Sequence, residues 1–176
     1  MNVLKKSLLA SAVALARATA VAEVSMTVGM VSDYVYRGAS LGDAGAYGSI
    51  DYASGGFYAG VWTISDGYGV NEAEDDFGGS SSIEYDIYAG YETEIGGVAL
   101  GIGYTAYEYT YTDDSESEIT LSAGMGPISL AYSDGTDDDV ATETDYEVMT
   151  LSADIGVFSV TYGDYDAEGG AAGDYD

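Results

Sequence analysis

The chain has 176 residues, no cysteine and no histidine, and a formal charge of −27 from 31 acidic and four basic residues. Without histidine, a hydrolase built on a His-containing triad is excluded and the commonest transition-metal ligand is missing. Without cysteine, the fold must hold without disulfides. The strong negative charge repels nucleic acid, so nucleic acid is not an expected partner. We therefore expect no enzyme, no catalytic residue, no metal centre and no cofactor.

The first 22 residues have the pattern of a signal peptide. Lys5 and Lys6 precede an apolar run from Leu8 to Ala16, and Ala20-Val21-Ala22 fits the usual cleavage pattern. The run is too short to cross a bilayer as a helix, so cleavage after Ala22 is expected rather than retention as an anchor. The mature chain would then carry 31 acids against Arg37 alone, a formal charge of −30. Its expected parts are a β-domain over residues 23–164 and an acidic, glycine-rich tail over residues 165–176.

The rest of the chain alternates apolar and polar residues with a period of two. In the first expected strand, Val24–Arg37, one face starts with Val24, Met26 and Val28, and the other with Ser25 and Thr27. Successive strand side chains point to opposite faces, so this pattern predicts one apolar and one mostly polar wall. About nine strands are predicted, near residues 24–37, 46–52, 57–65, 83–95, 98–109, 119–125, 128–133, 149–154 and 158–163. The strand at 57–65 cannot be oriented, because Phe57 and Trp62 fall on opposite faces.

Tight glycine-containing turns alternate with longer segments, most of them acidic. The turns are expected at residues 53–56, 96–97, 126–127 and 155–156, and the loops at 38–45, 66–81, 112–117, 134–141 and from 164 onward. Bacterial outer-membrane barrels have short periplasmic turns and longer outer loops. The pattern predicts an all-β, antiparallel, up-and-down transmembrane β-barrel. Nine strands are one short of the even number that a closed barrel needs. Either a closing strand is missing or the chain is truncated before it, which would give ten or more strands, or one weak strand has been miscounted.

The distribution of charge favours a membrane barrel over a soluble one. A soluble β-sandwich or barrel would also alternate, but its outer face would carry Lys and Arg beside the acids. Here most acids fall in the expected loops and the mature chain has no lysine. Tyrosines at strand ends fit the aromatic girdles of a bilayer interface, although Tyr is also simply a good strand former. The girdle candidates are Tyr34, Tyr36, Tyr91, Tyr104, Tyr132 and Tyr162.

Four stretches of the chain resemble a known family. Ser32-Asp33-Tyr34-Val35-Tyr36-Arg37-Gly38-Ala39-Ser40 looks like the end of the first strand in the TorF family of Gram-negative proteins assigned as porins, although Leu41 stands where that family commonly has Gln. Residues 48–52, 54–62 and 84–91 resemble its next strands. The resemblance covers most of the mature chain. It implies an outer-membrane β-barrel of the Gram-negative cell with porin function, and no catalytic residues.

Arg37 is the centre of the candidate electrostatic site. It shares a strand face with Asp33, and a confined cation needs a carboxylate partner. If that face lines the lumen, Arg37 should pair with Asp33, Asp51, Glu84 or Asp86, forming an internal lock or a constriction. The alternative places Arg37 at the barrel rim in solvent. Divalent cations could bind the acidic loops, although residues 134–139 lack the ligand order of an EF-hand.

Two functions are consistent with these features of the sequence. The first is a pore for passive, cation-preferring passage of small solutes, since acidic rings concentrate cations. The second is a non-conducting surface barrel that acts through acidic extracellular loops in adhesion, packing or cation bridging. Outer-membrane lipid is the expected partner of either.

Overall fold

The computed structural model describes residues 22–42, 44–65, 83–110, 113, 115–139, 142–167 and 173–175. The expected signal peptide, apart from Ala22, lies outside the described residues, as do the expected loop at 66–81 and residues 168–172 of the expected tail. The described residues form an antiparallel all-β structure. None of them belongs to a helix long and apolar enough to cross a membrane.

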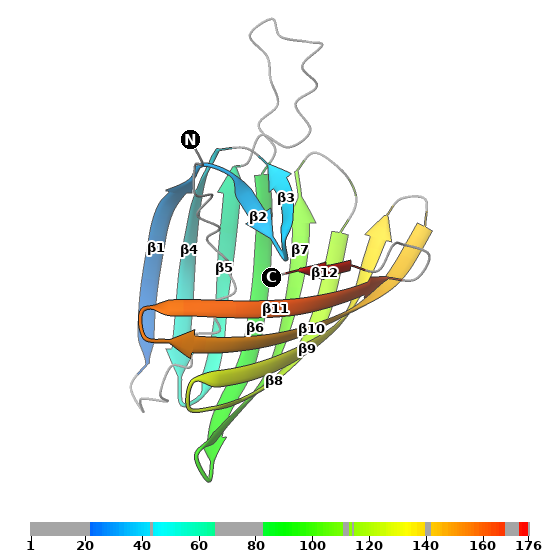
Figure 1. Ribbon diagram of the computed structural model, residues 1–176. Helices are drawn as coiled ribbons and strands as arrows, with labels where there is room; N and C mark the ends of the chain where they lie inside the picture. Colours follow the sequence, from blue (N-terminus) through cyan, green and yellow to red (C-terminus); the bar gives the residue numbers. More distant parts are fainter. Residues whose placement is uncertain are drawn as a thin grey trace, which may run out of the picture.

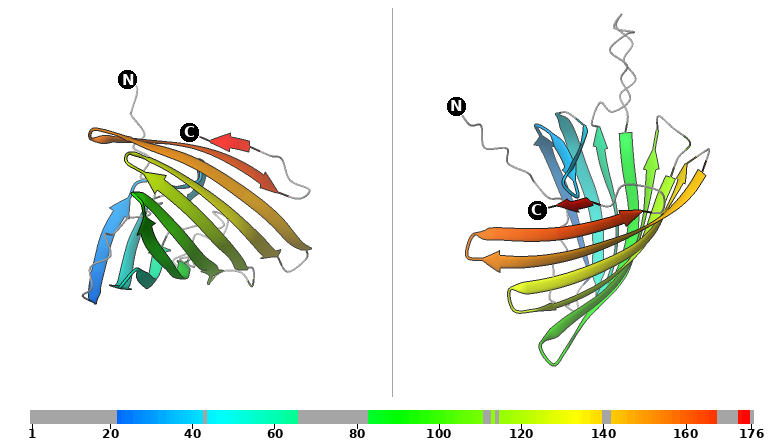
Figure 2. Two further views of the ribbon diagram at one scale, coloured as in Figure 1. Left: turned by 90° about the horizontal axis from the view of Figure 1, so that it is seen from below. Right: turned by 45° about the vertical axis from the view of Figure 1, so that its right-hand side comes forward.

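Ten strands form one meandering antiparallel sheet in the order β1-β4-β5-β6-β7-β8-β9-β10-β11-β12. All nine expected strands are present in it, which confirms the period-two interpretation. The sheet coils so that β11 passes in front of β4 and β5 (Figure 1), and the view from below shows the same curved wall (Figure 2). Among the described residues no pairing joins β1 to β11 or β12, so the sheet is open. The strands are β1 Glu23–Val31, β4 Gly45–Ser54, β5 Phe57–Ser65, β6 Ile83–Ile95, β7 Val98–Tyr109, β8 Ser115–Met125, β9 Ile128–Asp139, β10 Thr142–Ile155, β11 Phe158–Ala167 and β12 Gly173–Tyr175.

A separate two-stranded sheet lies inside the curve of the large one. It consists of β2 (Tyr34–Tyr36) and β3 (Ala39–Gly42), and we call residues 34–42 the inner hairpin (Figure 1). The first strand was expected to run on to Arg37, and the segment from 38 to 45 to be a loop; both predictions are wrong. The chain leaves the large sheet after Val31, and Arg37 and Gly38 adopt φ angles of 48° and 77°. Two consecutive positive φ angles make the tight turn that reverses a hairpin.

Glycines close the tight turns of the large sheet as predicted. Gly96 and Gly97 have φ angles of 64° and 84°, and Gly126 and Gly156 have φ angles of 59° and 67°. Such positive angles match the right-handed twist of the paired strands, which is why glycine is favoured there.

Three expected acidic loops are in fact largely strand. β8 already begins at Ser115, β9 continues to Asp139, and β11 continues to Ala167, three residues into the expected tail. In these extensions most residues on both faces are polar, so they lack the alternation of apolar and polar residues that marks a strand in the sequence. The backbone ladder nevertheless continues through them, as in the pair Thr136↔Asp145, where the threonine hydroxyl donates to the carboxylate at 3.1 Å.

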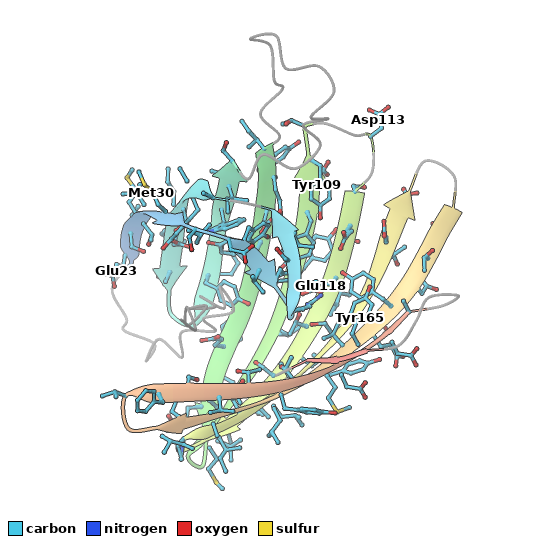
Figure 3. All side chains as sticks on the ribbon, turned by 45° about the horizontal axis from the view of Figure 1, so that its top comes forward. Glu23, Met30, Tyr109, Asp113, Glu118 and Tyr165 are labelled. Carbon is cyan, nitrogen blue, oxygen red and sulfur yellow. The ribbon has the colours of Figure 1, made fainter. Side chains whose placement is uncertain are left out.

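The two faces of the sheet differ sharply in exposure and chemistry. On the convex face, large apolar side chains are open to the surroundings; Val28 is 81% and Met30 84% exposed. Met30 points outward in Figure 3, whereas Glu118 and Tyr165 lie inside. The most buried side chains all come from the concave face or the inner hairpin: Tyr34, Ile64, Tyr107, Tyr146, Val148, Glu84, Glu118 and Ser133. The core of the molecule is therefore the packing of the inner hairpin against a polar, aromatic concave wall.

Candidate functional site on the concave face

The inner hairpin crosses the concave face from one side to the other. It starts beside β1, and its residues meet successive strands of the wall as the chain advances toward its tip (Figure 1). Tyr34 reaches β5 and β6, Tyr36 reaches β7, and Arg37 at the tip reaches β8 and β10. The wall residues that receive them are Trp62 of β5, Glu84 of β6, Tyr107 of β7, Glu118 of β8 and Tyr146 of β10.

Glu118 is the wall residue that fixes the tip of the hairpin. Arg37 Nη2 lies 2.6 Å from Glu118 Oε2, and the two side chains are only 15% and 6% exposed. The Tyr107 hydroxyl donates to Oε1 at 3.0 Å and the Tyr146 hydroxyl to Oε2 at 3.3 Å. A buried ion pair is stable only when its remaining hydrogen-bonding capacity is met, and here two phenols meet it. We call Tyr36, Arg37, Tyr107, Glu118 and Tyr146 the Glu118 cluster.

Aromatic rings enclose the guanidinium of Arg37. Its carbon lies 4.7 Å from the ring centroid of Tyr36 and 6.0 Å from that of Tyr146, within cation–π range. Burial raises the pKa of the Tyr36 phenol, and the adjacent Arg37 charge offsets only part of that rise. Tyr36 therefore stays protonated at neutral pH and shares a hydrogen bond of 2.8 Å with Tyr107.

A second contact fixes the base of the hairpin. The Tyr34 hydroxyl donates to Glu84 Oε1 at 3.0 Å, and its ring lies 5.9 Å from that of Trp62. Burial and the nearby Glu84 carboxylate raise the pKa of Tyr34, so that it remains a donor at neutral pH. Asp86 lies two residues along β6 on the same face, and its Oδ1 atom is buried without a hydrogen-bond partner in the described part of the chain.

The structure places the predicted site residues in different surroundings. Arg37 is inside, as the lock hypothesis requires, but the prediction of its partners is wrong, because it pairs with Glu118. Asp33 accepts a hydrogen bond from Ser40 at 2.7 Å within the same short segment. Asp51 accepts one from Ser49 at 2.7 Å and another from Tyr88. Glu84 and Asp86 lie at the base of the hairpin rather than at its tip.

Sequence reasoning missed Glu118 because the expected strand began one residue later, at Ile119. Extending the alternation backward from Thr120 would have put Glu118 and Glu116 on the polar face of β8. The face rule also failed for Arg37, because the bend at Ser32 and Asp33 separates it from the first strand. The two tyrosines of the hairpin, Tyr34 and Tyr36, were assigned to a bilayer girdle and instead point into the interior.

Arg37 is the only basic residue in the described part of the chain, and Glu118 takes its charge. The other concave-face acids, such as Asp51, Asp86 and Glu116, outnumber this one base, so the described part of the face has an excess of acidic residues. No three acidic side chains of the described residues are arranged to hold a metal ion.

Tyrosines fill the spaces that small residues leave on this face. A Cβ atom added at Gly135 would lie 2.3 Å from the Tyr146 ring, and one at Gly90 would lie 2.3 Å from the Tyr58 hydroxyl. Tyrosine rings therefore lie directly over glycines of neighbouring strands, a pairing that stabilises sheets at glycine positions. At these positions the space beside each glycine is therefore occupied by a tyrosine ring.

The fold and site define an antiparallel all-β protein with an apolar convex face and a polar concave face that holds an inner hairpin. Residues 15–163 match the model of the family described as "Bacterial protein of unknown function (Gcw_chp)", and the chain belongs to that family. No curated protein and no solved structure matches it.

Proposed function

We propose that this protein is an outer-membrane β-barrel that forms a pore for passive, cation-preferring passage of small solutes. The observation that carries the proposal is the continuous apolar convex face. Its exposed members occur on every long strand from β1 to β11: Val24, Met26, Val28, Met30, Ile50, Phe57, Val61, Ile87, Ile95, Ile102, Ile119, Leu121, Leu130, Met149, Leu151, Phe158 and Val160.

Lipid is the environment that makes such a surface stable. Burying one Val, Leu, Ile or Phe side chain that would otherwise stay exposed is worth roughly 1.5–3 kcal/mol. Soluble monomers rarely expose apolar patches above a few hundred Å². Within the described residues no second layer covers this face, and the polar side chains line the other side. A soluble sandwich would have the opposite arrangement.

The strand lengths support a spanning role. A transmembrane strand needs about 9–11 residues, and the strands from β4 to β11 have 9 to 14. Tyr91, Tyr104 and Tyr162 lie on the convex face, each 49% exposed, so their rings would face lipid in the proposed barrel. With a cleaved signal peptide, the chain would be exported to the outer membrane of a Gram-negative cell.

The charge of the concave face supports cation preference. Arg37 is the one base among the described residues and it pairs with Glu118, so acidic side chains outnumber bases on the concave face. Rings of acidic side chains favour cations and exclude anions. In the proposed barrel, the concave face is the lining of the pore.

Bilayer recording in a salt gradient tests the proposal. The mature protein is refolded in detergent and inserted into a planar bilayer under a KCl gradient. It should conduct, and the sign of its reversal potential should show selectivity for K⁺ over Cl⁻. Heat-modifiable migration on a gel establishes separately that the barrel is folded. Folded protein that inserts but does not conduct, or that favours chloride, would reject the pore.

The second candidate function is a non-conducting surface barrel. One observation favours it: the inner hairpin packs against five strands of the concave face and leaves that face occupied. In that case the acidic loops would act in adhesion, packing or cation bridging at the cell surface. The same recording separates the two functions, because a folded, inserted and silent barrel supports the second.

A further inference from the structure

We propose that the inner hairpin is the constriction of the pore, and that the Arg37–Glu118 pair sets the largest solute that can pass. This inference rests on the proposed pore function. It gives a role to a segment that the wall of a barrel does not need, since β1 and β4 pair directly with each other over nine residues without it.

The path of the hairpin is the first argument. In the strand order of the sheet, β8 is the sixth of ten strands counted from β1. The chain leaves the wall at Val31 of β1, and Arg37 meets the wall again at Glu118 of β8. Between these two points the hairpin contacts β5, β6, β7 and β8 in turn, so it lies across the concave face and occupies part of the space inside the curve of the sheet (Figure 1).

The second argument is that the hairpin is held at both ends. At its base, Tyr34 contacts Trp62 and donates to Glu84. At its tip, Arg37 forms the ion pair with Glu118, which also accepts hydrogen bonds from Tyr107 and Tyr146. A segment fixed at two points stays over the concave face and narrows the space there, whereas a segment fixed at one end can move aside.

The contact at the tip is the easier of the two to remove by substitution, because it depends on a single basic residue. Every other charged side chain on the described concave face is acidic, so nothing there can replace Arg37 at Glu118. Removing either member of the pair should leave the hairpin held by Tyr34 and by the Tyr36–Tyr107 hydrogen bond, while its tip loses the contact with β8. The pore should then admit larger solutes.

Two substitutions remove the pair without adding a charge of either sign. Arg37→Asn deletes the charge but keeps a residue that tolerates the positive φ of 48° at the turn. Glu118→Gln deletes the carboxylate but keeps an oxygen that can accept the hydroxyl of Tyr107. Glu116→Gln is the matched control: it removes the same charge from the same face of β8, but its hydrogen-bond donor is Tyr109 of the wall. A fourth form replaces residues 34–42 with a short Gly/Ser linker.

Size exclusion is measured by the swelling of liposomes that hold the full mature chain, in neutral sugars from a pentose to a trisaccharide. Neutral sugars report bore size without the effect of charge. The wild type and Glu116→Gln should exclude the trisaccharide, and Arg37→Asn, Glu118→Gln and the linker form should admit it. Conductance in about 1 M KCl, where the screening length is roughly 3 Å, should rise in the same three forms.

Trp62 gives an independent measure of hairpin position. It is the only tryptophan of the chain and lies against Tyr34 and Tyr47. Its emission should shift to the red, and its quenching by acrylamide should increase, in the linker form and to a smaller extent in the two pair variants. Glu116→Gln should leave both unchanged.

The possible failures are distinct. If the wild type conducts but the linker form shows the same size limit and the same conductance, the constriction is wrong and the pore stands. If every form folds and inserts but none conducts, the pore itself is wrong, and the constriction with it. If the point variants do not fold, the linker form alone decides between these outcomes.

Discussion

Arg37 occupies a position that is unfavourable for its residue type in two ways. Its φ of 48° lies in the left-handed region, which costs of order 1–3 kcal/mol for a residue other than glycine. Its charge is also withdrawn from water. Both costs are tolerated because the turn delivers the guanidinium to Glu118, between the rings of Tyr36 and Tyr146. The strained backbone of the turn and the buried ion pair therefore depend on each other.

Reversing the charge of Arg37 should therefore destabilise the folded protein. Arg37→Glu would put two carboxylates at the tip contact, and breaking a buried ion pair by removing one partner costs about 3–5 kcal/mol. We expect a clear fall in the urea midpoint of the protein in detergent and loss of the heat-modifiable gel shift at lower temperature. Arg37→Asn removes the positive charge without adding a negative one, so its urea midpoint should fall less. An unchanged gel shift for Arg37→Glu would contradict the role of Arg37 as a lock.

Replacing Gly135 should directly disturb the packing of a tyrosine ring over a glycine of the neighbouring strand. A Cβ atom there would lie 2.3 Å from the Tyr146 ring, and Tyr146 is its direct partner across β9 and β10. Gly135→Ala should lower stability by roughly 1–3 kcal/mol, the usual cost of overpacking. Gly48→Ala is the control, because its nearest neighbour would be a backbone oxygen at 3.2 Å. Equal urea midpoints for the two variants would contradict the claim that the Tyr146 ring needs a glycine at position 135.

At the scale of the strands, the turns determine which segments pair. Gly96 and Gly97 join β6 to β7 with positive φ at both positions, and an added Cβ would meet nothing within 4 Å at either. The requirement for glycine there is one of backbone conformation alone, since there is space for a side chain. The same reasoning separates these glycines from Gly135, where space is the constraint.

Substitutions at Gly97 test that distinction. Gly97→Asn should be close to neutral because Asn tolerates the left-handed region, whereas Gly97→Val should cost about 1–2 kcal/mol because a β-branched residue does not. Both are compared with the wild type by urea unfolding. If Asn and Val are equally tolerated, φ is not what selects glycine at this turn.

The strands that carry an apolar face were predictable from the sequence, and the polar ones were not. Period-two alternation located β6 with its bounds, Ile83–Ile95, because Ile and Tyr alternate with acids along it. The same rule ended β9 early, because beyond Ser133 both faces are polar and no contrast marks the strand. The inner hairpin was invisible for a related reason: Tyr34 and Tyr36 continue the alternation, and only the Arg37–Gly38 turn interrupts it. Glu118 as the partner of Arg37 depends on a contact across 81 residues that no local pattern encodes.

At the scale of the whole molecule, the two faces of the sheet assign opposite environments to neighbouring residues. Leu121 and Ser122 are adjacent near the middle of β8. Leu121 is 52% exposed on the convex face, and Ser122 lies on the concave face opposite Gly101. In a soluble protein a residue as exposed as Leu121 would accept a charge with little effect, within about 0.5 kcal/mol. In a membrane barrel its position would lie near the midplane of the bilayer.

The paired substitutions Leu121→Arg and Ser122→Arg separate these environments. For a lipid-facing strand, arginine near the midplane costs about 2–4 kcal/mol, whereas a residue on the inner face alters selectivity instead. We expect Leu121→Arg to reduce insertion into liposomes and to lower the urea midpoint. Ser122→Arg should insert normally and move the reversal potential toward anions, because it adds a base to a face whose described residues include one base, Arg37, that is already paired. If Leu121→Arg folds and remains stable in water without detergent, the convex face does not meet lipid, and the membrane proposal falls with it.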